Sequence, residues 1–281
     1  IKCRYDIRVE GYFPQPPFLL LANHSQNVDP FFLLATIRKP VSFVINNAAF
    51  QNPVVGLVLR WIDSIPKQKS TNDMKAVIGI FRWLKAGRIV GIFPEGHATW
   101  TGESMEAYGG TAKLLDKVNL PIVTCTIKGG YLVHPRWAKK KRKGPIDLII
   151  KTYEDSKALQ ALKVSDWQWQ FDNGYLYKGS KKALGIERIM WFCPACSAYR
   201  TIIGKGNKVH CTRCGFSTDI SESGRIGDLT AVDLLKSQKE LLVHWLQSNQ
   251  KPLIFEKATI KIWGKERTIR LKKEKGTLVI T

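Results

Sequence analysis

Residues 18–30 read Phe-Leu-Leu-Leu-Ala-Asn-His-Ser-Gln-Asn-Val-Asp-Pro, and this stretch decides the fold. Its short apolar run predicts a buried strand over Phe18–Ala22. Asp29 followed by Pro30 is typical of a helix start, with the aspartate at the N-cap and the proline at the first helical position. The stretch therefore predicts a strand, a loop that carries His24, and a helix.

His24 and Asp29 are candidates for a catalytic pair. A carboxylate beside an imidazole fixes the tautomer of the ring and stabilises its protonated form. Such a pair can take a proton from a hydroxyl group that attacks a substrate. The same pattern also fits an ordinary loop histidine and a plain N-cap aspartate, so a second motif has to decide.

The alternation of strands and helices continues along the first half of the chain. Strands that alternate with helices indicate an α/β fold with a mixed, mostly parallel sheet flanked by helices. Apolar patterns predict strands over Tyr5–Val9, Phe18–Ala22, Val41–Ile45, Ile89–Phe93, Ile122–Ile127 and Ile146–Thr152. Helices are predicted over Pro30–Arg38, Pro53–Trp61, Asn72–Ala86 (with Asn72 as the cap) and near Thr111–Val118.

Two of these strands lead directly into residues whose side chains can take part in catalysis. His24 follows the strand Phe18–Ala22, and Glu95 follows the strand Ile89–Phe93. In open α/β sheets, sites lie outside the carboxyl ends of the strands. We therefore expect both side chains at the same edge of the sheet.

Three motifs in this order resemble the 1-acylglycerol-3-phosphate acyltransferase (lysophospholipid acyltransferase) family. They are His24-x4-Asp29, Phe93-Pro94-Glu95-Gly96 and Leu120-Pro121-Ile122-Val123. The resemblance implies an acyltransferase fold and the transfer of a fatty acyl group from an acyl-CoA or acyl-ACP thioester. The implied acceptor is the free hydroxyl of lysophosphatidic acid, and the implied product is phosphatidic acid.

The resemblance also implies residue roles. His24 would be the general base and Asp29 its orienting partner, with loop N–H groups near the helix start as oxyanion donors. Glu95 and Gly96 would position the glycerol part of the acceptor, and Pro121 would shape the acyl pocket. The complete set of expected substrate-binding residues is Phe93, Pro94, Glu95, Gly96, Lys67, Lys69 and Pro121.

The chain departs from the family pattern in ways that concern the acceptor. Gln26 stands where a small hydroxyl residue is usual, and His97 follows the Phe93–Gly96 motif where many members carry arginine. Lys67 and Lys69 stand where the family usually has arginine, and lysine lacks the bidentate fork that arginine offers to phosphate. Another lysolipid or a glycerol-type acceptor therefore remains an alternative.

Four cysteines in two Cys-x2-Cys pairs predict a zinc ribbon in the second half of the chain. Four thiolates make a closed tetrahedral site, so the zinc would be structural, and Gly215 permits the tight turn after the second pair. Two disulfides are the alternative interpretation. The expected ligands are Cys193, Cys196, Cys211 and Cys214.

The charge of the chain favours anionic partners. Its 44 Lys and Arg against 23 Asp and Glu give a net charge of +21. Such a field suits an acidic phospholipid surface, a phosphorylated substrate, an acyl carrier protein or nucleic acid. The basic run Lys139–Lys143 beside Trp137 suits lipid headgroups, or it is a solvated loop, and the apolar helix Val54–Trp61 would add contacts. Nucleic acid is disfavoured because the basic residues do not gather around the cysteine pairs.

The sequence predicts a peripheral protein on the cytoplasmic side of the cell membrane. No apolar run has the eighteen or so residues of a transmembrane helix, and no signal peptide is visible. The chain begins at Ile1 without Met, so an N-terminal anchor could precede it.

Four segments follow from these patterns. We expect a catalytic domain over 1–156, a linker over 157–188, a zinc ribbon over 189–220, and a helix with a small β-module over 221–281. In the last segment, Leu229–Gln247 predicts an amphipathic helix. Short strands are expected over Ala258–Trp263, Thr268–Leu271 and Thr277–Ile280. The combination resembles one bacterial subgroup of the acyltransferase family.

Overall fold

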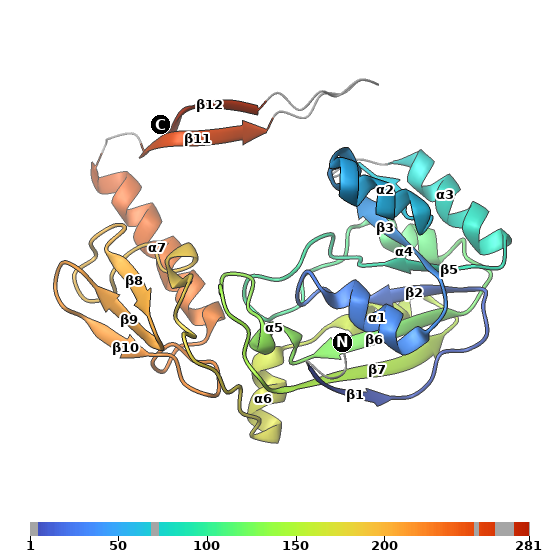
Figure 1. The fold of residues 1–281 in the computed structure, drawn as a ribbon, viewed down its shortest axis with the longest axis horizontal. Coiled ribbons are helices and arrows are strands. Elements are labelled where there is room, and N and C mark those ends of the chain that lie inside the picture. Colours follow the sequence, from blue (N-terminus) through green and yellow to red (C-terminus); the bar gives the residue numbers. More distant parts are fainter. Residues whose placement is uncertain (1–4, 69–72, 250–252, 262–272, 281) are drawn as a thin grey trace. The chain divides into compact units, whose positions relative to one another are not determined.

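The computed structural model describes residues 5–68, 73–249, 253–261 and 273–280. The chain forms two compact units, Ile1–Leu235 and Lys236–Thr281. A seven-stranded sheet lies at the centre of the first unit (Figure 1). Its strands are β1 (Asp6–Glu10), β2 (Phe18–Ala22), β3 (Val41–Asn46), β4 (Ile65–Lys67), β5 (Ile89–Ile92), β6 (Ile122–Lys128) and β7 (Pro145–Tyr153).

The strand order confirms the expected mixed, mostly parallel sheet. It runs β1-β7-β6-β2-β5-β3-β4, and only β6 and β7 pair antiparallel. The short strand β4 was not predicted, because three residues carry too little pattern. The helices of this unit are α1 (Asp29–Ile37), α2 (Pro53–Trp61), α3 (Met74–Lys85), α4 (Gly110–Leu115), α5 (Gly130–Val133) and α6 (Asp166–Asn173), with 3₁₀ turns η2 (Asn47–Gln51), η3 (Ser156–Leu162) and η4 (Ile186–Arg188).

Strand β2 is the most deeply buried part of the sheet. It lies between β5 and β6, and all five of its residues are buried. Phe18 and Leu20 belong to one hydrophobic cluster, whereas Leu19 and Leu21 belong to another. Burying such a side chain contributes about 1.5–3 kcal/mol, so β2 gives the loop that follows it a firmly held starting point.

Two helix starts differ from the expectation. Helix α1 begins at Asp29 itself, and the side chain of Asp29 does not cap it, because that carboxylate binds groups in the preceding loop. Helix α3 is capped by Asp73, which accepts hydrogen bonds from the N–H groups of Lys75 and Ala76. The expected cap, Asn72, lies outside the described residues.

The segment expected as a linker packs into the main core. Trp167, Trp169 and Tyr177 are all at most 8% exposed, and they share one hydrophobic cluster with residues of β6 and β7. The indole N–H of Trp167 donates to the carbonyl of Thr101 at 2.6 Å. Residues 157–188 thus contribute structure to the sheet-bearing part of the chain.

The basic loop also differs from the expectation. Trp137 is only 1% exposed and its indole N–H donates to Tyr131 Oη, while Arg142 is 3% exposed. The loop is drawn inward because Lys139 N donates to Leu184 O at 2.8 Å. Trp137 is therefore not available as a membrane contact, although the neighbouring lysines of the run are exposed.

A small antiparallel sheet follows the first cysteine pair and carries the second pair at the end of one strand and in the turn that follows it. It consists of β8 (Ile202–Lys205), β9 (Lys208–Cys211) and β10 (Ser217–Asp219). Its backbone packs tightly on the preceding segment: Ala183 N donates to Gly206 O at 3.0 Å. A Cβ atom at Gly204 would lie 1.9 Å from the Ala183 carbonyl oxygen, so glycine is required there.

The remaining elements are a helix and a hairpin. Helix α7 (Ala231–Asn249) spans the boundary between the two units, and β11 (Leu253–Lys261) pairs antiparallel with β12 (Lys273–Ile280). The expected strand Thr268–Leu271 lies outside the described residues. Within the described parts of the chain, no helix combines the length and apolarity of a membrane span.

Candidate active site

The loop between β2 and α1 begins with a clamp. Asn23 is 5% exposed, its amide donates to Ile127 O at 2.8 Å, and its carbonyl accepts from Ile127 N at 2.7 Å. These two bonds join the carboxyl ends of β2 and β6. The next residue, His24, is therefore held at the predicted edge of the sheet.

His24 and Asp29 form the expected pair. His24 Nδ1 lies 2.9 Å from Asp29 Oδ2. Asp29 is fully buried, and it also accepts from Ser25 N at 2.7 Å, Gln26 N at 2.8 Å and Ser25 Oγ at 2.9 Å. These four donors stabilise a buried carboxylate that fixes the imidazole. Because Nδ1 is engaged, Nε2 is the ring nitrogen that can accept a proton.

Phe93 fixes the plane of the imidazole. The two ring centroids lie 4.4 Å apart, and Phe93 in turn stacks on Phe43 at 6.0 Å. Phe93 follows β5, the neighbour of β2, which explains why two distant motifs meet here. The histidine is therefore oriented by a carboxylate on one side and an aromatic ring on the other.

Glu95 holds the loop that carries the histidine. Its Oε1 accepts from His24 N at 3.1 Å, and its Oε2 accepts from Met105 N at 3.2 Å. The side chain is 5% exposed, and burial raises the pKa of Glu95 to about 7. Both carboxylate oxygens thus bind backbone groups, a role that sequence reasoning did not foresee.

The rest of this motif makes a tight turn. Gly96 N donates to Phe93 O at 3.0 Å, and Gly96 has φ +74°, a conformation that favours glycine. A Cβ atom there would also lie 2.3 Å from the ring of Tyr108. Pro94 accepts a hydrogen bond from Tyr108 N at 3.1 Å, which closes the loop that follows.

Two hollows adjoin this cluster. The smaller, of about 10 Å³, is lined among others by His24, Glu95, Thr99 and Asp166. The larger, of about 150 Å³, is lined by the apolar side chains of Met105, Leu159 and Leu162 and by the polar side chains of Glu106, Gln160 and Lys163. Because Glu95 lines both, the histidine end of the site adjoins this larger cleft of mixed lining.

The other expected substrate-binding residues differ in their placement. Lys67 lies near the Phe93–Gly96 turn, with its Nζ atom 5.4 Å from the ring centroid of Tyr108. Lys69 lies outside the described residues. Pro121 lies at the opposite end of the sheet, because its carbonyl accepts from Leu19 N as β6 begins. The structure therefore does not bring Pro121 to the histidine.

Three residues at the site were missed. Asn23 precedes His24, and Thr99 lies three residues after the Phe93–Gly96 motif, so their closeness to these motifs in the sequence could have identified them. In the structure, Thr99 N donates to His24 O at 2.9 Å. Asp166 lines the smaller hollow but lies far away in sequence. Its neighbours carry no recognisable motif, so only the fold reveals it.

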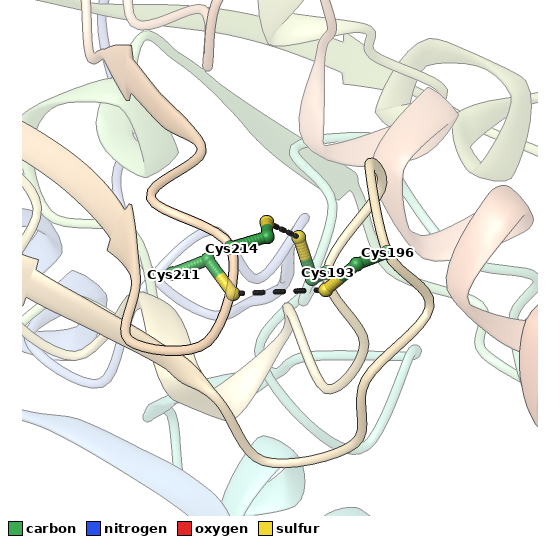
Figure 2. Close-up of side chains that lie close together, drawn as sticks. All are labelled: Cys193, Cys196, Cys211 and Cys214. Atoms are coloured by element: carbon green, nitrogen blue, oxygen red, sulfur yellow. Dashed lines mark hydrogen bonds between the residues drawn. The ribbon is translucent and has the colours of Figure 1, made fainter.

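The four expected cysteines converge in a separate cluster (Figure 2). Their sulfur atoms all lie within 4.8 Å of one another, with Cys193 Sγ 3.6 Å from Cys214 Sγ and Cys196 Sγ 3.9 Å from Cys211 Sγ. Four sulfurs around a tetrahedral ion at 2.3 Å would lie about 3.8 Å apart. A disulfide needs about 2.05 Å. The cluster therefore fits a metal ion, and Gly215, with φ +77°, makes the expected turn.

Comparisons with known proteins find similarity to acyltransferases. The Acyltransferase family model matches residues 6–128. The chain is 27% identical over 135 residues to the 1-acyl-sn-glycerol-3-phosphate acyltransferase of Bacillus subtilis (strain 168), covering 47% of this chain and 64% of that protein.

A solved structure is also similar. The crystal structure of the 1-acyl-sn-glycerophosphate (LPA) acyltransferase PlsC from Thermotoga maritima matches with 21% identity and a TM-score of 0.47, over 53% of this chain and 62% of that one. The chain thus spans less than two thirds of the length of either relative. The residues that match the Acyltransferase family model include His24, Asp29 and the Phe93–Gly96 motif.

Proposed function

We propose that this chain is an O-acyltransferase that moves a fatty acyl group from acyl-CoA or acyl-ACP to the free hydroxyl of 1-acyl-sn-glycerol-3-phosphate. The product is phosphatidic acid. The observation that carries the proposal is the His24–Asp29 pair at 2.9 Å, held at the sheet edge inside the acyltransferase-family domain. The printed name of the Bacillus subtilis relative supports this acceptor.

The geometry supports a direct transfer. His24 Nε2 takes the proton of the acceptor hydroxyl while that oxygen attacks the thioester carbonyl carbon. The tetrahedral intermediate then expels the thiolate, which receives the proton from the imidazolium, leaving an ester and a free thiol. Asp29 stabilises the imidazolium throughout. The N–H groups of His24, Ser25 and Gln26 already bind carboxylates, so the oxyanion needs donors other than these three.

An acyl-transfer assay with a panel of acceptors tests this function. Labelled acyl-CoA and acyl-ACP are offered with lysophosphatidic acid, other lysolipids and glycerol 3-phosphate. We expect ester formation with lysophosphatidic acid, its loss in His24→Ala, and its retention in His244→Ala, a histidine on α7 with an exposed side chain. A folded wild-type protein that acylates none of these acceptors contradicts the proposal. A protein that prefers another acceptor contradicts the choice of lysophosphatidic acid and identifies the acceptor that takes its place.

A lipid surface is the proposed place of action. Helix α2 exposes Val54 (71%), Leu57 (68%) and Trp61 (83%), an apolar face that suits insertion between headgroups. The net charge of +21 adds attraction to anionic lipids. We place the protein peripherally on the cytoplasmic side of the cell membrane, with α2 as its contact.

Zinc is the proposed ion of the cysteine cluster. Four cysteines leave no open coordination position, so the ion would hold the small sheet together and take no part in acyl transfer. Because Gly204 packs closely on Ala183, an ordered ribbon would also stabilise residues 157–188, the segment that packs on the main sheet. Elemental analysis of the purified protein tests the identity of the ion.

A further inference from the structure

Residues 164–167 lie beyond the acyltransferase-family domain, yet they form part of the wall around His24. Val164 and Asp166 line the same small hollow as His24 and Glu95. The expected end of the catalytic domain, residue 156, falls short of them. The site is therefore incomplete without a segment that no family motif marks.

This segment is joined to the loop that follows the Phe93–Gly96 motif. Asp166 N donates to Gly102 O at 2.9 Å, and Ser104 N donates to Val164 O at 2.8 Å. Gly102 has φ +89°, and a Cβ atom there would lie 2.7 Å from the ring of Tyr131. The segment 164–167 is thus docked by backbone bonds in a closely packed place.

The carboxyl group of Asp166 reaches across to the turn after β6. The side chain is 2% exposed, and its two oxygens accept from Gly129 N at 2.8 Å and Tyr131 N at 2.9 Å. A buried carboxyl group is costly unless it is hydrogen-bonded, so these two bonds determine where the turn 129–131 can lie.

The turn 129–131 contacts the loop between β2 and α1 that carries His24. Gly130 O accepts from Gln26 Nε2 at 3.0 Å, and a Cβ atom at Gly130 would lie 2.1 Å from Ser25 Oγ. Ser25 and Gln26 are the residues whose groups donate to Asp29. A displaced turn would therefore displace the partners of the carboxylate that orients His24.

We propose that Asp166 is a positioning residue for acyl transfer, and that the active site of this chain extends to residues 164–167. Asp166 fixes the turn 129–131, the turn supports Ser25 and Gln26, and these two hold Asp29 against His24. The effect of Asp166 on the rate of acyl transfer rests on the proposed function, whereas its effect on the position of His24 can be measured without activity.

The substitution Asp166→Asn tests this role. It keeps the size of the side chain but replaces one of the two accepting oxygens with an NH₂ group that faces an N–H donor, so one hydrogen bond is lost. We expect kcat to fall about tenfold to hundredfold, with KM for the acceptor unchanged, because a small misplacement of a catalytic group has effects of this size. Asp172→Asn, on the exposed side of α6, is the matched control and keeps wild-type kcat.

A second readout does not need activity. We expect the NMR signals of the His24 imidazole, recorded at fixed pH and assigned by their absence from His24→Ala, to shift in Asp166→Asn and not in Asp172→Asn. A residue that only stabilises the fold would lower the melting temperature and leave these signals in place. Failure of the proposed function would remove activity from the wild type but leave this comparison intact.

Gly130→Ala perturbs the same contact from the other side and decides the matter if Asp166→Asn does not fold. Its methyl group would force Ser25 to move, whereas Gly110→Ala, with no atom within 4 Å of the new methyl group, is the matched control. We expect Gly130→Ala to shift the His24 signals and lower kcat. Unchanged His24 signals in a folded Asp166→Asn, or in Gly130→Ala if Asp166→Asn does not fold, would overturn the proposal.

Discussion

Removing either member of the His24–Asp29 pair should stop acyl transfer, but the two losses should differ in their effect on stability. His24→Ala removes a proton acceptor, and general-base catalysis is worth about 10²–10⁴-fold in rate. Asp29→Ala removes the group that orients this base, so its loss of activity should be no larger. The two variants should differ in stability, because each leaves a different number of buried hydrogen-bonding groups without a partner.

The magnitude follows from the contacts of Asp29. Its removal leaves the backbone N–H groups of Ser25 and Gln26 without an acceptor in a buried loop. An unsatisfied buried donor costs about 1–3 kcal/mol, so the two together lower the free energy of unfolding by about 2–6 kcal/mol. His24→Ala leaves the other three donors to Asp29 in place, so its cost should be about 1 kcal/mol, one hydrogen bond.

Urea denaturation and steady-state kinetics on the same preparations measure both quantities. We expect His24→Ala to be inactive and nearly as stable as the wild type, and Asp29→Ala to be inactive and clearly destabilised. An Asp29→Ala protein as stable as the wild type would refute the account of this loop. A folded His24→Ala protein with near-normal turnover would refute the assignment of the base.

Four further perturbations probe other parts of the molecule. Because burial raises the pKa of Glu95 from 4.5 to about 7, the folded state binds this proton more tightly than the unfolded chain, so the contribution of Glu95 to stability is greatest below pH 4.5 and is lost as the pH rises to about 7. The stability of the wild type relative to Glu95→Gln should fall by up to about 3 kcal/mol over this range, and a pH-independent difference in urea unfolding would contradict it. Arg142 is buried, and no described residue offers its three guanidinium nitrogens a hydrogen-bond partner, so Arg142→Met should raise the free energy of unfolding by about 1–4 kcal/mol, unlike Lys140→Met at the exposed neighbour. A less stable Arg142→Met protein would show that the guanidinium has a partner in solution. Chelation of the metal, or Cys196→Ser, should release one zinc ion per chain and first unfold the ribbon, as followed by hydrogen exchange; a metal-free protein with two disulfides would contradict this. Trp61→Glu should weaken binding to anionic vesicles while Phe171→Glu, at a residue on α6 that is also largely exposed (72%), should not, and binding should also weaken in high salt. Equal binding by both variants would remove α2 as the contact.

The sequence predicted secondary structure and site residues correctly where the pattern of neighbouring residues agrees with the fold. Helix α2 was predicted with its observed ends from its apolar pattern, and the structure shows that Asn52 caps it and Pro53 occupies its first turn. The all-apolar run of β2 was equally clear, because a strand between two others is buried on both faces. The pairing of His24 with Asp29 followed from five-residue spacing across one loop.

Long-range packing accounts for what the sequence did not reveal. Trp137 and Arg142 read as surface residues in a basic run, but both are buried, and a backbone hydrogen bond from Lys139 to Leu184 holds their loop against a segment far along the chain. Pro121 immediately precedes strand β6 whereas His24 follows β2, and the parallel pairing of β2 with β6 places such positions at opposite ends of the strands. Asp166 was invisible because the helix that carries it meets the site only through the three-dimensional fold.

The most direct test of the central claim is the stoichiometry of the products formed from labelled acyl-CoA and 1-acyl-sn-glycerol-3-phosphate. The account predicts that wild-type protein releases free thiol and forms labelled phosphatidic acid in equal amounts, and that His24→Ala forms neither. Release of thiol with free fatty acid in place of phosphatidic acid, or equal product from wild type and His24→Ala, would contradict it.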